Sequence, residues 1–222
     1  MSNTDSFIDE VNDEVRRDRL YAMLRRYGWI AILIVLLLVG GAAWREYARA
    51  RDTAAAQETG DALLSALEAE TPEARIAALD GVATGTPEAQ ALRIFLQASE
   101  AGANGNREEA AAMLDRVAGI EGLDPAYRTL AAFKALTQRA ETMDPAARRE
   151  AYREMATPGA MTRLLAEEQI ALTHVEEGNP DEAIAVLRDI LVDANVTSGL
   201  RQRATQLIVA LGGTPEAEAA AE

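Results

Sequence analysis

The chain has 222 residues, a net charge of −14 at pH 7 and no cysteine. The absence of cysteine excludes disulfides, thiolate nucleophiles and thiolate metal ligands. The excess of acidic residues argues against a nucleic-acid partner, because it would repel a phosphate backbone.

The N-terminal tail, residues 1–26, is charged and is expected to form a short amphipathic helix. Phe7, Val11 and Val15 share one face at helical spacing. Two interpretations of this helix stay open. It makes a contact in the cytoplasm, or it lies in the membrane interface and only sets the depth of the segment that follows.

A long apolar stretch follows the tail. Residues 27–44 contain no charged side chain, and an unbroken aliphatic block runs from Ile30 to Val39. At about 1.5 Å per residue the stretch reaches roughly 27 Å, close to the roughly 30 Å hydrocarbon core of a bilayer. Aromatic and arginine side chains, which favour the membrane interface, stand at both ends, so we expect a transmembrane helix over residues 27–47. The residues expected to anchor it are Trp29, Ile30, Ile32, Leu36, Val39 and Trp44.

Other interpretations of this stretch stay open. The small residues Ala54–Ala56 would suit a cleaved signal peptide, although acidic residues precede the apolar block where signal peptides are short and basic. A helix buried in a soluble core would need a second segment of comparable hydrophobicity, which the chain does not contain. More arginines precede the stretch than follow it, which favours a cytoplasmic N-terminus, with the opposite topology as the alternative.

Residues 48–213 are expected to form an all-α domain, because apolar residues recur at helical spacing and runs typical of strands are missing. Prolines mark helix starts, where a missing N–H costs nothing. These prolines are Pro72, Pro87, Pro125, Pro145 and Pro180. These helix starts and the apolar spacing predict helical hairpins over residues 53–83, 88–119, 125–156 and 160–193. A polar-faced helix over residues 198–211 is expected to cover the last hairpin. Residues 214–222 are low in complexity and are expected to be disordered.

Small residues recur within these hairpins. Ala74, Ala110, Ala147 and Ala183 lie about 36 residues apart. The segment Glu167–Asn195 is similar to a tetratricopeptide repeat, in which a small residue lets two antiparallel helices approach and a large one fills the groove beyond. The residues expected to pack the repeats are Ala74, Ala98, Ala110, Leu114, Ala147, Ala171, Ala183 and Leu187.

The order of a charged tail, one membrane span and degenerate tetratricopeptide-like repeats resembles the ancillary SecYEG translocon subunit family of bacterial inner-membrane proteins. "RRYG" enters the span and "GGAAWREY" leaves it. The resemblance implies a single-pass protein with a cytoplasmic N-terminus and a periplasmic domain. It also implies association with the SecYEG protein-export channel and with periplasmic chaperones, including a membrane-anchored peptidyl-prolyl isomerase. The acidic tail and the irregular first and third repeats depart from the family pattern, so the partners stay open.

Chemistry-bearing motifs are absent from the sequence. His174 is the only histidine and falls at a packing position of a repeat, and neighbouring acidic residues on a helix point about 100° apart and do not converge. Phosphate-binding and nucleophile-elbow motifs are missing. We therefore expect no enzyme activity, no cofactor and no metal.

The first helices of the hairpins are expected to line an inner face. The candidate partner-binding residues on this face are Leu92, Phe95, Leu165 and Leu172, with packing inside an irregular solenoid as the alternative role. The leading hypothesis is a membrane-tethered scaffold that links the export channel to chaperones and emerging clients. A cell-division or envelope-assembly coordinator, and an envelope enzyme or metal-binding protein, are the alternatives. A homo-oligomer also stays open.

Overall fold

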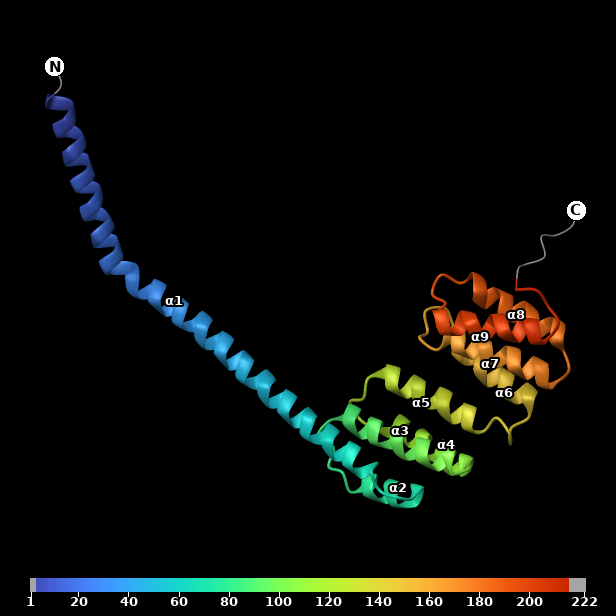
Figure 1. Cartoon of the computed structure of the whole chain (residues 1–222). Helices are drawn as coiled ribbons and strands as arrows, with labels where there is room; N and C mark the ends of the chain where they lie inside the picture. The colour runs from blue at the N-terminus through green and yellow to red at the C-terminus, as the bar shows by residue number, and fades with distance from the viewer. Residues whose placement is uncertain (1–2, 216–222) are drawn as a thin grey trace, which may run out of the picture. The chain divides into compact units, whose positions relative to one another are not determined.

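The computed structural model describes residues 3–215, which are helical and contain no strand. Side chains are described from Tyr21 onward, except those of Ala22, Leu24 and Ala31. Figure 1 shows the helices in chain order. Their bounds are α1 Asn3–Ala66, α2 Pro72–Asp80, α3 Pro87–Ala103, α4 Arg107–Asp115, the 3-10 helix Arg116–Gly119, α5 Pro125–Gln138, α6 Pro145–Met155, α7 Arg163–Glu176, α8 Pro180–Val192 and α9 Ser198–Ala210.

The chain divides into two compact units, one up to Glu58 and one from Thr59 onward. The sequence places the start of the helical domain earlier, at residue 48. The difference arises because residues 49–58 are exposed on α1, whereas Leu63 is the first side chain of the chain's described part that is buried in a core.

In the first unit, α1 contains one stretch that is long and apolar enough to cross a membrane. None of this apolar stretch is buried in the structure. Within the described part of this unit no other segment covers the stretch, and a helix buried in a soluble core stays an alternative to the membrane span. The six anchor residues are all exposed, and the two tryptophans are 63% and 73% exposed. Phe7, Val11 and Val15 lie outside the described side chains, so the expected amphipathic face of the tail stays a prediction.

In the second unit, the helices start where the sequence chemistry places them. Five of them, α2, α3, α5, α6 and α8, begin at the prolines named above. Thr71 and Thr86 cap α2 and α3, and Asp124 and Asp144 cap α5 and α6, each through a side-chain oxygen that accepts a backbone N–H. These caps satisfy donors that the first turn of a helix otherwise leaves unpaired.

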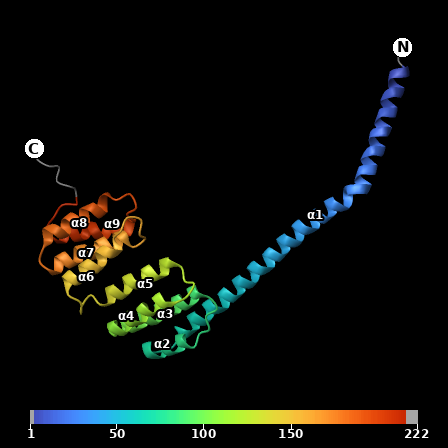
Figure 2. The same ribbon diagram turned by 180° about the vertical axis from the view of Figure 1, so that it is seen from behind.

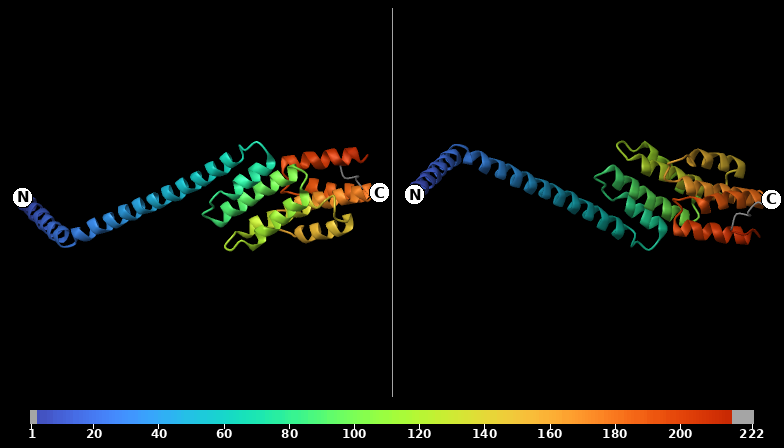
Figure 3. Two further views of the ribbon diagram at one scale, coloured as in Figure 1. Left: turned by 90° about the horizontal axis from the view of Figure 1, so that it is seen from below. Right: turned by 90° about the horizontal axis from the view of Figure 1, so that it is seen from above.

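Each helix of the second unit packs against the next along the chain, as the views in Figure 2 and Figure 3 show. One apolar cluster joins the end of α1 to α2 and α3, and another joins α3, α4 and α5. A third joins α5, α6 and α7, and the last joins α7, α8 and α9. The core is thus a series of small clusters, each shared by consecutive helices.

Six of the residues expected to pack the repeats are buried, and two are not. Ala98, Ala110, Leu114, Ala171, Ala183 and Leu187 are at most 2% exposed. Ala74 on α2 and Ala147 on α6 are exposed, so the packing role predicted for them is wrong. A one-residue change of register turns a helix by about 100°. On α6 that change brings Arg148 and Tyr152 into the interior in place of Ala147.

Candidate partner-binding seam

The four candidate partner-binding residues do not form one surface. Leu92 on α3 is 47% exposed, whereas Phe95 on the same helix is half-buried against the cluster of α3, α4 and α5. Leu165 and Leu172 on α7 are half-buried and line two separate hollows between α7 and α9. Leu92 and Phe95 line neither of these hollows. We call the two hollows together the α7–α9 seam.

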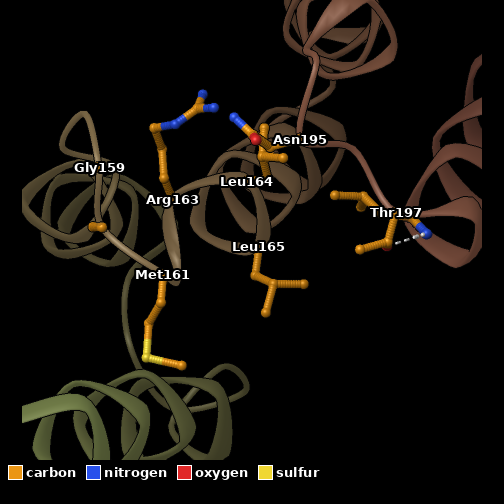
Figure 4. A pocket seen from close by; sticks show the side chains of 9 residues that line it. Gly159, Met161, Arg163, Leu164, Leu165, Asn195 and Thr197 are labelled. Atoms are coloured by element: carbon orange, nitrogen blue, oxygen red, sulfur yellow. Dashed lines mark hydrogen bonds between the residues drawn. The ribbon is translucent and has the colours of Figure 1, made fainter. Parts of the chain in front are cut away.

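The first hollow of the seam has a volume of about 520 Å³. Leu165 of α7 and Leu200 of α9 both line it, although Leu200 is only 3% exposed and belongs to the cluster of α7, α8 and α9. Met161 also lines it, with 63% of its surface exposed. Figure 4 shows Met161 and Leu165 extending toward the same side, while Arg163 and Asn195 point toward one another on the other side. The hollow therefore has an apolar side and a polar side.

Arg163 fixes the polar side of the first hollow. Its guanidinium contacts Glu167 of the same helix at 2.9 Å and Asp193 of the loop before α9 at 2.5 Å. The backbone N–H of Asn195 donates to Asp193 Oδ1 at 2.8 Å. This backbone hydrogen bond and, after it, Arg163 hold the pKa of Asp193 below its usual value. The loop that carries Asn195 is thereby held to the start of α7.

The second hollow has a volume of about 540 Å³ and lies two helical turns further along α7. Leu172 of α7 faces Leu207 and Ala210 of α9 there. Gln169 and Gln206 also line it. Apolar and amide-bearing side chains thus line the same hollow.

An ion pair ties the two walls of the seam together. Glu168 of α7 is 6% exposed, and its two carboxylate oxygens accept hydrogen bonds from Nε and Nη2 of Arg203 on α9, each at 2.7 Å. The hydrogen bonds that Arg203 donates to Glu168 raise the pKa of Arg203. A bidentate pair of this kind fixes direction as well as distance. It sets the width of the seam, because it joins side chains from both helices.

The seam presents no constellation of nucleophile and base. His174, on α7, is half-buried, and its Nδ1 has no hydrogen-bond partner among the described residues. Its backbone carbonyl accepts the N–H of Asn179 at the turn into α8. Among the side chains that the structure describes, from Tyr21 onward, no group of three histidine or acidic residues is placed to hold a metal ion. What the geometry offers is two hollows lined by apolar and polar side chains of α7 and α9.

Sequence reasoning missed the contribution of α9. The sequence predicts that residues 198–211 form a terminal cap with a polar face. In the structure, however, Leu200 and Leu207 of α9 line the same two hollows as Leu165 and Leu172 of α7. Both pairs are seven residues apart, which places each pair on one face of its helix. This shared spacing is the sequence signal that could have indicated that α9 contributes to the same surface as α7.

Comparison with known proteins found no matching family model, no matching curated protein and no matching solved structure.

Proposed function

We propose that this protein is a membrane-tethered, non-enzymatic docking protein that binds a partner polypeptide along the α7–α9 seam. The observation that carries the proposal is the pair of partly apolar hollows, which remain open to solvent in a domain whose other apolar side chains are largely packed in clusters. Leu165 and Leu172, one in each hollow, are seven residues apart on α7, so at about 1.5 Å of rise per residue the two hollows are about 10 Å apart. Two apolar anchors of an extended or helical segment span that distance.

The membrane tether gives a weak docking surface its use. An unbroken α1 connects the exposed apolar stretch to Leu63 and Ala66, which are buried against Leu79 of α2. A domain held at a membrane meets partners in the same membrane at a high effective concentration, with no new contact needed. A modest binding energy at the seam therefore suffices for occupancy.

We further propose that the partners belong to the protein-export machinery, namely the SecYEG channel, chaperones near it and emerging clients. The support is the resemblance of nearly the whole chain to the ancillary translocon subunit family, together with helical hairpins close to the bounds expected for tetratricopeptide-like repeats. In this proposal the N-terminus is cytoplasmic and the domain is periplasmic in a bacterial inner membrane. A reporter fused to the C-terminus tests that orientation.

Site-specific crosslinking in intact membranes tests the function. The chain has no cysteine, so Leu165→Cys and Leu172→Cys each introduce a single thiol for a photoreactive label. Ala74→Cys is the matched control, because Ala74 is exposed on α2 and outside the seam. We expect crosslinks to export-channel or chaperone subunits from the two seam positions and none from the control. Capture of division or envelope-assembly proteins would support the alternative scaffold. Equal yields from all three positions would refute a docking role for the seam.

A further inference from the structure

Two arginines lie on one face of α1 just after its apolar stretch. Arg45 and Arg49 are four residues apart, so their side chains project from the same side of the helix. Both are exposed, and neither makes an ion pair or hydrogen bond within the part of the chain that the structure describes, although Glu46 adjoins Arg45. Arginines of the helical domain behave differently. Those at 75, 139, 148, 149, 163 and 203 each pair with a carboxylate of another element.

A hollow of about 480 Å³ lies on this same face. Gly41 is among the residues that line it, and a Cβ added there would meet nothing within 4 Å. Leu37 and Leu38 form its apolar end, and Arg45 and Arg49 form its polar end. The hollow therefore passes from hydrocarbon side chains to guanidinium groups along the helix axis.

The depth of these residues follows from the membrane anchor, so the inference rests on that part of the proposed function. Trp44 and Tyr47, whose ring centroids are 6.3 Å apart, mark the interface at this end of the span. Along the axis Gly41 lies about 4.5 Å before Trp44 and Arg49 about 7.5 Å beyond it. The hollow thus faces acyl chains, and the two guanidinium groups stand at the level of the phosphates.

We propose that this face binds one anionic phospholipid of the leaflet on the C-terminal side of the span. An acyl chain occupies the hollow beside Gly41, and the phosphate lies between Arg45 and Arg49, since guanidinium groups match phosphate oxygens in a bidentate manner. Charge complementarity selects an anionic lipid. Arg45, Glu46 and Arg49 leave one net positive charge, which a singly negative headgroup neutralises and the ammonium of a zwitterionic headgroup does not.

Tryptophan fluorescence tests the proposal, because the chain has two tryptophans, one at each end of the span. The full chain carrying Trp29→Phe is reconstituted in phosphatidylcholine vesicles, and Trp44 emission is quenched with brominated phosphatidylglycerol or with brominated phosphatidylcholine. We expect phosphatidylglycerol to be preferred at Trp44. The preference should fall about fivefold for each of Arg45→Gln and Arg49→Gln, and Gly41→Leu should also weaken it by filling the hollow.

A matched control separates a defined site from general attraction to positive charge. Ala50→Arg combined with Arg49→Ala keeps the number of arginines but places one of them about 140° around the helix from Arg45. The proposal requires this variant to lose preference as Arg49→Gln does. Full preference in the rearranged variant, or equal quenching by the two lipids in the parent chain, would overturn the lipid site and leave the anchor intact. Failure of both brominated lipids to quench Trp44 would instead refute the membrane anchor, and the lipid site with it.

Discussion

Arg148 and Ala147 on α6 offer the sharpest test of the structure, because adjacent residues are assigned opposite roles. Arg148 is 2% exposed, and its guanidinium donates to the backbone carbonyls of Ala140 and Met143 and to the carboxylate of Glu176. It therefore joins the loop before α6 to the end of α7. Ala147 is exposed and makes no such connection. We expect Arg148→Ala to destabilise the domain strongly and Ala147→Ser to be tolerated.

The magnitude follows from the separate contacts. Each part-buried carbonyl left without its donor costs about 1 kcal/mol, at the low end of the range for a buried group. The Glu176 side chain is 47% exposed. Water can therefore replace its partner, and that ion pair contributes less than about 1 kcal/mol. Loss of the packed arginine stem adds about 1 kcal/mol. The total is about 3 kcal/mol for Arg148→Ala, against less than about 0.5 kcal/mol for Ala147→Ser.

Urea unfolding of the full chain in mild detergent, followed by circular dichroism, measures both variants under the same conditions. Hydrogen exchange over α6 and α7 then shows whether the loss is local to the contacts of Arg148. Glu176→Gln keeps an acceptor and should cost less than about 1 kcal/mol. The reasoning is refuted if Arg148→Ala unfolds at the urea concentration of the parent, or if Ala147→Ser proves the more destabilising of the two.

Three further outcomes are expected. Ala183→Leu should overpack the contact between α7 and α8 and lower the free energy of unfolding by about 1–3 kcal/mol. Ala74→Leu, on the exposed side of α2, should change the melting temperature little. Similar shifts in melting temperature for the two variants would contradict the burial pattern. Gly178 has a φ of 77° at the turn between α7 and α8. Gly178→Ala should therefore cost about 1 kcal/mol in thermal unfolding, and an unchanged melting temperature would argue against this turn. Because the pKa of folded Asp193 lies below its usual 3.8, its contribution to stability is complete above that value and is lost as pH falls through the lowered pKa. Melting temperatures measured across that acid range should consequently fall less steeply for Asp193→Asn than for the parent chain, and identical slopes would refute the coupling.

The seam shows where reasoning from the sequence alone stopped short. Leu165 and Leu172 are predicted partner-binding residues and do line hollows, but Leu92 and Phe95, chosen by the same repeat register, line neither of them. Repeat register places a residue on a face of its own helix. It does not say which neighbouring helix lies opposite, and α9 supplied half of each hollow.

What the sequence determined by itself is what depends on nearby residues. Proline and capping residues gave the helix starts, because they act on backbone groups within one turn, and a continuous run of apolar residues gave the membrane-compatible stretch of α1. Only the tertiary structure decided which side of each helix is inside. At α6 it buried a hydrogen-bonded Arg148 and exposed Ala147, since the sum of contacts from the loop before α6 and from α7 outweighed the preference of small apolar residues for the interior. These contacts involve residues far apart in the chain, so a local sequence pattern cannot predict them.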